Sequence, residues 1–209
     1  QAGLNVHTIV TDMNQVLGTT AGNALEIQEA ISFLRNEHRD KRLELVTLNL
    51  CAEMLVVSGL EGDRDIAYKK CEGALSSGHA AEKFSQMCAL LGGPKDFVEK
   101  AENYLPKAPI VKPVYSKGIV SKVDGWILGN AVIELKGGRK IAGESIDFSV
   151  GFSEIAPIGC KLDESKPLAL IHASSEESAS IAEKRLLQAY ELGEDNIQPN
   201  PLIVEILTE

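Results

Sequence analysis

The chain has 209 residues, of which 44% are hydrophobic, enough for one large domain or two small ones with an ordinary apolar core. Its formal net charge is −9, from 21 basic and 30 acidic residues. A nucleic-acid groove or an anionic membrane surface needs clustered Lys and Arg, so the charge argues against both as partners. The sequence has neither an apolar run of the roughly 18 residues that a membrane span needs nor a signal peptide. We therefore expect a globular, cytoplasmic protein.

The cysteine content predicts neither a disulfide framework nor a metal site. The four cysteines show no C-x-x-C spacing, and the first three fall at apolar positions of predicted helices: Cys51, Cys71, Cys88 and Cys160. We expect all four to be reduced and buried.

Residues 6–29 predict a strand, a loop and a helix in succession. Residues 6–10 read as a buried strand, residues 18–22 as a loop of small and polar residues, and Asn23 as the helix cap, with Glu26 completing a capping box. In open α/β sheets, ligands collect at the carboxyl ends of the strands, so residues 12–29 are the first place to look for a site. This segment offers no nucleophile and no acid–base pair.

The rest of the front half is predicted to be helical. Apolar residues at helical spacing predict four further helices: 43–58, a helix capped by Asp63 and ended by Gly78, 79–91, and a short helix from Pro94 to about residue 104. One strand cannot form a sheet. The partner of the strand at 6–10 must come either from the second half or from residues outside this sequence.

The composition changes at LPKAPIVKP, residues 105–113, which contains three prolines and is followed by β-branched residues. This change predicts a boundary between domains at 1–107 and 108–209. The second half predicts a helix around 126–135, a turn at 159–165, a final helix at 175–192, and strands at 111–115, 118–123, 145–152, 167–172 and 202–207. The expected fold class is α/β, with an α+β second half.

Two features of the first segment suggest binding chemistry. The Gly18–Gly22 loop precedes a helix, where backbone N–H groups bind anions. Its spacing fits neither G-x-G-x-x-G nor the P-loop and no Lys follows, so a tight turn is favoured over a phosphate cradle. Glu29 lies where it could reach carbonyls freed in the loop, an oxygen set that suits a hard cation. The alternative for Glu29 is a solvated helix carboxylate.

Three features of the second half could be functional but are more simply explained as structural. His172 ends an apolar strand, and we expect a hydrogen-bonded core or edge histidine rather than a catalyst. Gly137–Arg139 could form a second anion pocket, but GGR after a helix is more often a cap and turn. GIVSKV and GCKLDESKPLALIHA are typical of barrel-sandwich modules, which include biotinyl and lipoyl carriers. Lys122 is followed by VDG rather than Met, which disfavours a carrier.

The block TDMNQVLGTTAGNALEIQEA resembles the thymidine and pyrimidine nucleoside phosphorylase family, in which a similar block follows a core strand. The likeness continues through DFVEKAENYLP, GNAVIELKGGRKIAGESIDFSVGF and GCKLDESKPLALIHA, and so covers nearly the whole chain in order. Within the family the chain resembles the bacterial thymidine phosphorylases, given IDFSVG and the length of the tail. One departure is Val16, where many members have Pro, and we expect that change to be structural.

The resemblance implies a homodimeric enzyme in which phosphate attacks C1′ of a pyrimidine deoxynucleoside. The family's K-H-S-T-G-G phosphate loop and its base-holding Arg, Ser and Lys lie upstream of the TDM block, and no such loop occurs here. The chain, which begins at Gln1, is therefore expected to be the carboxyl-terminal half: the later part of the α/β domain, then a strand-rich, barrel-sandwich-like α+β module. We expect no catalytic or substrate-binding residue in it, and no activity alone.

The resemblance also implies a cation site. Family members bind a cation beside the phosphate loop through carbonyl oxygens of the LG-x-x turn and a carboxylate of the next helix. The matching positions are Leu17 and Thr20 for the carbonyls and Glu29 for the carboxylate. The cation could be monovalent or divalent, inorganic phosphate is the implied co-substrate, and no organic cofactor is expected. The alternative to an enzyme is a complete, non-enzymatic α/β binding or scaffold module.

Overall fold

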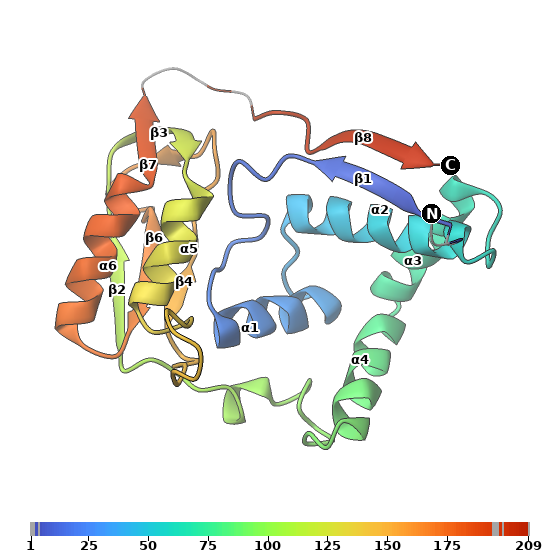
Figure 1. Cartoon of the computed structure of the whole chain (residues 1–209), viewed down its shortest axis with the longest axis horizontal. Coiled ribbons are helices and arrows are strands. Elements are labelled where there is room, and N and C mark those ends of the chain that lie inside the picture. Colours follow the sequence, from blue (N-terminus) through green and yellow to red (C-terminus); the bar gives the residue numbers. More distant parts are fainter. Residues whose placement is uncertain (1–2, 4, 194–196, 198, 209) are drawn as a thin grey trace. The chain divides into compact units, whose positions relative to one another are not determined.

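The computed structural model describes residues 3, 5–193, 197 and 199–208. These residues form six α-helices, one short 3-10 helix and eight strands (Figure 1). The chain folds into two compact units, the first from residues 1–12, 31–100 and 200–209 and the second from residues 13–30 and 101–199. Neither unit is one continuous segment. The domain boundary at residue 107 stays a prediction.

The first unit is mainly helical, and its helices share apolar contacts, with side-chain caps on two of them. Its helices are α2 (Lys41–Val57), α3 (Arg64–Ser76) and α4 (His79–Leu90), together with the last residues of α1 (Asn23–Leu34). The Asp40 side chain accepts hydrogen bonds from the first backbone N–H groups of α2, and Asp63 does the same for α3. Phe33, Leu48 and Leu75 form the buried cluster between these helices.

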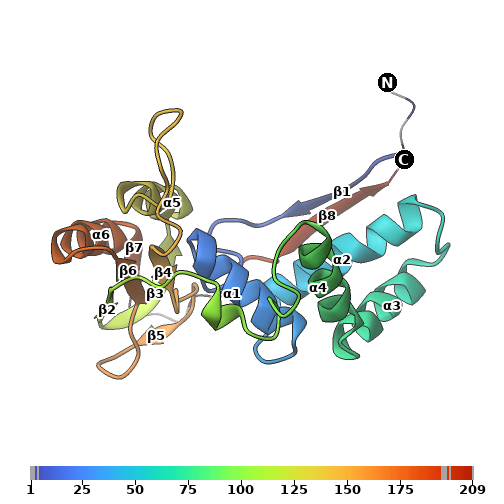
Figure 2. The same ribbon diagram turned by 90° about the horizontal axis from the view of Figure 1, so that it is seen from below.

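Strand β1 (His7–Thr11) pairs with β8 (Ile203–Thr208) in an antiparallel, two-stranded sheet of the first unit (Figure 2). The end of the chain therefore supplies a partner for the first strand. The strand predicted at residues 6–10 is present as β1, but the prediction that it is buried was wrong, because Val6 is 55% and Val10 40% exposed. Alternate residues of β1 are only partly buried, and α2 is the helix that contacts this strand.

A buried carboxylate joins three elements of the first unit. The Glu53 side chain on α2 is 6% exposed, its Oε2 lies 2.7 Å from His7 Nδ1 on β1, and its Oε1 accepts a hydrogen bond from Arg64 on α3. Arg64 also donates to the Asn49 side chain. Burial alone would raise the pKa of Glu53, but the hydrogen bonds from His7 and Arg64 outweigh it and lower that pKa.

Replacing Glu53 with Gln is expected to lower the free energy of unfolding by about 1.5 kcal/mol at pH 7. Because the folded-state pKa of Glu53 is lowered, its stabilisation is present above the unfolded value of about 4.3 and is lost as the pH falls through the folded value. Urea unfolding of both proteins at pH 7 and at pH 2.5 measures this, and the difference should shrink at the lower pH. Glu72→Gln, on the exposed side of α3, is the control. A deficit independent of pH would contradict the assignment.

The second unit contains two open, three-stranded antiparallel sheets. One has the strand order β2 (Ile110–Val114), β6 (Ala169–Ala173), β4 (Gly151–Ser153), and the other has the order β5 (Lys161–Leu162), β3 (Gly118–Val123), β7 (Tyr190–Gly193). The expected barrel-sandwich-like arrangement was wrong, since the described strands close into no barrel.

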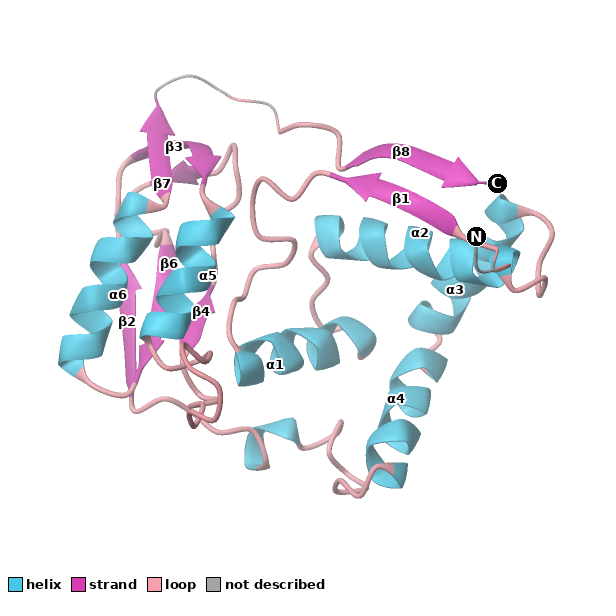
Figure 3. Cartoon of the chain, viewed as in Figure 1, coloured by secondary structure: helices cyan, strands magenta, loops and turns pink. Residues whose placement is uncertain are grey.

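Helices α5 (Gly125–Glu134) and α6 (Glu176–Gln188) contact each other and pack on the first of these sheets (Figure 3). Along β6, Ala169, Ile171 and Ala173 are buried, whereas the alternate residues Leu170 and His172 are only partly buried. The period of two in a strand therefore turns His172 to the sheet face opposite the buried side chains. That face carries a pocket described below.

Four predicted elements differ from the structure. The helix predicted over 175–192 ends at Gln188, because residues 190–193 pair with β3 as strand β7. The turn predicted at 159–165 contains the short strand β5. The helix predicted from Pro94 was wrong: residues 95–99 form turns, followed by a 3-10 helix at Ala101–Asn103. The strand predicted over 145–152 is reduced to Gly151–Ser153.

The cysteines are free, as predicted, but only Cys160 is buried and the other three are partly buried. Within the ranges that the structure covers, no helix combines the length and the apolar character needed to cross a membrane.

Candidate functional site

The loop at residues 17–22 lies against the Glu29 carboxylate of α1. Glu29 Oε1 accepts hydrogen bonds from the Thr19 backbone N–H at 2.7 Å and from Thr19 Oγ1 at 2.6 Å. Its Oε2 accepts one from Thr20 Oγ1, also at 2.6 Å. A Cβ on Gly18 would lie 2.6 Å from Glu29 Oε2, so any side chain there would displace this carboxylate from its position. Glu29 thus fixes the loop through three short hydrogen bonds.

The beginning of α1 is held by groups other than those predicted. The Gly22 backbone N–H donates to Glu26 Oε1 at 2.9 Å, so Gly22 rather than Asn23 occupies the cap position. The prediction that Asn23 caps the helix was wrong. Its Nδ2 instead donates to the Gly137 carbonyl at 2.7 Å, a contact 114 residues away in sequence that local pattern could not reveal.

Strand β4 and the residues after it hold the other side of the loop. The backbone groups of Ala21 and Phe152 exchange two hydrogen bonds, of 2.9 and 2.8 Å, in an isolated antiparallel bridge. The Ile155 N–H donates to the Thr19 carbonyl at 3.0 Å. Thr19 is therefore bonded on both sides, to Glu29 through its N–H and hydroxyl and to the β4 side through its carbonyl.

Two glycines make this backbone crossing possible. A Cβ on Gly151 would lie 2.2 Å from the Ala21 carbonyl oxygen, and one on Gly22 would lie 2.5 Å from the Val150 carbonyl oxygen. Both have positive φ, +148° for Gly151 and +142° for Gly22, which side chains rarely adopt. The backbone of the loop and that of β4 therefore cross so closely that neither Gly22 nor Gly151 has room for a side chain.

The residues just before the loop also join the second unit. The Gln15 side chain is buried and its Oε1 accepts a hydrogen bond from the Ile158 N–H at 2.8 Å. Val16 packs against the apolar core of the unit.

These hydrogen bonds distinguish between the two interpretations of the loop at residues 18–22, a phosphate cradle and a tight turn. The N–H groups of Thr19, Ala21 and Gly22 all donate to groups of the protein itself. Amides engaged in this way are not available to an anion, so the loop behaves as a bonded turn and not as a phosphate cradle.

Of the three predicted cation ligands, the structure brings Glu29 and Thr20 into contact through the Thr20 hydroxyl. Among the described residues, no donor bonds to the carbonyl oxygens of Leu17 or Thr20. Three donors occupy the Glu29 carboxylate, which has about four lone-pair sites. The donor set is all oxygen, as a hard cation requires. The described residues hold no cluster of three or more His, Cys, Asp or Glu, and the predicted set needs only one such residue.

His172 is a hydrogen-bonded histidine, as expected. Its Nε2 lies 2.8 Å from Ser153 Oγ on the neighbouring strand. Burial lowers the pKa of the imidazole, an effect that the nearby Glu154 carboxylate only partly offsets. The ring is therefore neutral at pH 7.

The two remaining alternatives lose support. Lys122 lies within strand β3 and pairs with Glu191 at 2.6 Å, whereas a carrier lysine must stand exposed at a hairpin tip. In the GGR segment, the Arg139 guanidinium donates to the Glu144 carbonyl, and Glu144 Oε2 accepts from the N–H groups of Lys140 and Ile141. The Gly137 N–H donates to the Val132 carbonyl, and the Glu144 carboxylate beside this segment would repel an anion.

Sequence reasoning missed several residues that hold the loop, above all Gly18, Thr19 and Gly151. The available signal was the glycine in IDFSVGF and the pair of threonines beside Gly18, but the role of Gly151 depends on a contact between segments about 130 residues apart.

Residues 119–193 match the family model of the pyrimidine nucleoside phosphorylase C-terminal domain. The match runs from β3 to β7 and includes α5, α6 and β4. The chain therefore carries the C-terminal domain of this family, and the strand that bonds the Leu17–Gly22 loop belongs to it.

Proposed function

We propose that this chain is the carboxyl-terminal half of a thymidine phosphorylase, an enzyme that reversibly converts thymidine and phosphate to thymine and 2-deoxyribose 1-phosphate. The matched C-terminal domain supports the family, and IDFSVG together with the length of the tail supports a thymidine phosphorylase within it. The observation that carries the proposal is the Leu17–Gly22 loop, fixed between Glu29 and strand β4 of the matched domain. The proposal includes a cytoplasmic location and a homodimeric parent enzyme.

Phosphorolysis requires donors around phosphate, groups that stabilise the leaving base, and a site that tolerates positive charge at C1′. In this chain the amides of Thr19, Ala21 and Gly22 are bonded internally, and Glu29 is an acceptor that would repel phosphate. The part that this chain plays is therefore to support the phosphate loop carried elsewhere in the enzyme.

The oxygen set at the loop fits a monovalent or divalent cation in the complete enzyme. The carbonyl oxygens of Leu17 and Thr20 and the Glu29 carboxylate would hold it, and the Glu29 hydrogen bonds keep this carboxylate beside the turn. A bound cation would supply positive charge next to the phosphate. With only part of a coordination shell, the isolated chain is expected to bind such a cation weakly.

The purified chain is expected to show no turnover above background with thymidine and phosphate, because it lacks K-H-S-T-G-G and the base-holding groups. Absorbance of released thymine measures this. Adding a polypeptide that carries the phosphate loop and the base-holding residues of a thymidine phosphorylase should produce turnover. Turnover by the chain alone would contradict the assigned role, and failure of every such complementation would favour the non-enzymatic module.

A further inference from the structure

The second unit contains a pocket of about 320 Å³ on the outer face of the β2-β6-β4 sheet, and every residue that lines it belongs to that unit. This volume lies in the range of about 300 to 1,000 Å³ that is usual for small-molecule sites. Three elements build it: the first half of α1, the segment from residue 102 to β2, and the exposed face of β6. Neither the Leu17–Gly22 loop nor Glu29 lines this pocket.

Apolar residues form most of the pocket wall. They come from α1, from the proline-containing segment before β2 and from β2 itself: Ala24, Leu25, Leu105, Pro106, Ala108 and Val111. Val111 and His172 are directly paired across β2 and β6, so they share one face of the sheet. Such a wall favours a hydrocarbon group in the ligand, because the contact removes apolar surface from water.

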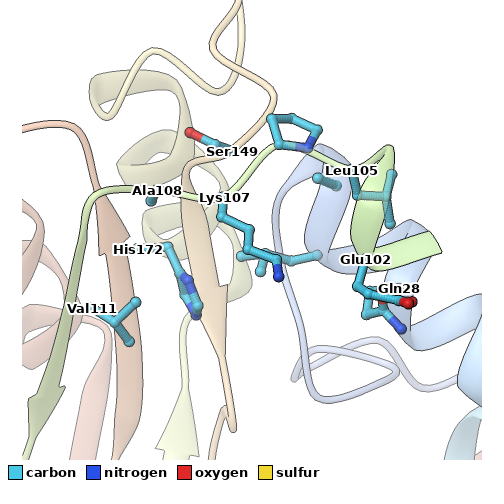
Figure 4. A pocket seen from close by; sticks show the side chains of 11 residues that line it. Gln28, Glu102, Leu105, Lys107, Ala108, Val111, Ser149 and His172 are labelled. Carbon is cyan, nitrogen blue, oxygen red and sulfur yellow. The ribbon is translucent and has the colours of Figure 1, made fainter. Parts of the chain in front are cut away.

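Two opposite charges face the pocket without being paired to each other (Figure 4). Gln28 and Glu102 stand on the helix side and His172 on the strand side, and the Lys107 side chain extends between them. Within the described part of the chain, the side chains of Lys107 and Glu102 form no ion pair or hydrogen bond, either together or with another group. Both charges are therefore free to engage a ligand.

These charges limit the class of ligand. The Lys107 ammonium and the Glu102 carboxylate balance, and burial lowers the pKa of His172 so that the ring is neutral at pH 7. A simple anion would be repelled by Glu102 and a simple cation by Lys107. An uncharged ligand would leave both groups without a counter-ion. A zwitterion can pair with both at once, through charge-assisted hydrogen bonds.

We propose that this pocket binds a free α-amino acid with a large apolar side chain, its carboxylate toward Lys107, its ammonium toward Glu102 and the side chain against the apolar wall. The Gln28 amide oxygen, on the same side as Glu102, supplies a further acceptor for the ammonium. The proposal follows from the pocket alone and does not depend on the proposed enzymatic function. Leucine is the first probe, because the wall is aliphatic.

Titration of the isotope-labelled full chain with leucine at pH 7, followed by NMR, tests the proposal. We expect saturable shifts of the His172 ring and of the Gln28 side-chain amide. N-acetyl-leucine has no ammonium and leucinamide has no carboxylate. Each should bind about fivefold more weakly than leucine, as the loss of one exposed ion pair does.

Two variants assign each charge of the ligand to its partner. Glu102→Gln should weaken the binding of leucine about fivefold but leave that of N-acetyl-leucine unchanged, since this derivative has no ammonium to lose. Lys107→Met should weaken the binding of leucine by a similar factor but leave that of leucinamide unchanged. This crossed pattern is a double-mutant cycle between the protein and the ligand.

Lys184→Met and Glu164→Gln are the matched controls, because both residues are exposed in the second unit and lie outside the pocket. The leucine affinity of these variants should equal that of the parent. The comparison of leucine with its two derivatives uses the unaltered chain, so it decides the matter even if a pocket variant does not fold.

Three results would overturn the proposal. The first is no saturation by leucine up to its solubility, and the second is shifts confined to residues outside the pocket. The third is binding of N-acetyl-leucine or leucinamide as tight as that of leucine, which would indicate the end of a peptide, rather than a free amino acid, as the occupant. The complementation assay for phosphorolysis depends on none of these results.

Discussion

Gly151→Ala is expected to lower the free energy of unfolding by about 3 kcal/mol. The added Cβ would lie 2.2 Å from the Ala21 carbonyl oxygen and 2.9 Å from the Gly22 Cα, both backbone atoms that cannot rotate away. The φ of +148° adds backbone strain for any side chain. The crossing must open, which breaks the Ala21–Phe152 bridge.

Urea unfolding measures the loss, and Gly129→Ala is its control. Gly129 lies within helix α5 of the same unit, and a Cβ there would meet nothing within 4 Å. Alanine should therefore stabilise that helix by roughly 0.5 to 1 kcal/mol. Amide exchange adds a local readout, since the N–H groups of Thr19 and Ala21 should lose protection in the Gly151 variant. Equal stability of the two variants would contradict the crossing.

The opposite signs expected for these two glycines show what local sequence cannot supply. Gly151 begins strand β4 and Gly129 lies within helix α5, and neither local sequence shows how much room a Cβ would have. Only the segment that packs against each one decides the outcome. The same holds for Asn23, whose position after a loop predicts a cap but whose side chain bonds to Gly137.

The helices were predictable where periodicity and caps agree. Asp63 as a cap and the helix from residue 79 are in the structure as predicted, and α2 starts two residues earlier than expected because Asp40 caps it. Strand β7 was not predictable in this way. Tyr190 and Leu192 continue the apolar spacing of α6, and pairing with Val123 and Val120 of β3 turns them into a strand.

In the candidate site, too, the local contacts were predictable from the sequence and the long-range contacts were not. Leu17, Thr20 and Glu29 were named from the resemblance, and the contact between Thr20 and Glu29 needs only nine residues of chain to form. Strand β4, which holds the loop from the other side, starts 130 residues after Ala21. No spacing rule within the first segment indicates that partner.

Glu29→Ala is expected to lower the free energy of unfolding by about 2 to 3 kcal/mol, because three hydrogen bonds to a partly buried carboxylate are lost together. Glu29→Gln should cost less, since the amide keeps one acceptor oxygen for Thr19. Urea unfolding measures both, with Glu164→Ala, an exposed loop carboxylate of the same unit, as the control.

Adding Thr20→Val to each Glu29 variant tests whether the loss of stability comes from the Thr20–Glu29 hydrogen bond or from removing the negative charge. Thr20 bonds only Oε2, so the double variant with Glu29→Ala should be less destabilised than the sum of the two single changes. Additive effects would show that the hydroxyl and the carboxylate act independently. A coupled loss, with exchange of the Thr19 amide accelerated and the helices unchanged, would locate the defect in the Leu17–Gly22 loop. This loop is the part of the chain that the proposed function requires to be rigid, so the same variants should reduce turnover in the complementation assay even at temperatures where they remain folded.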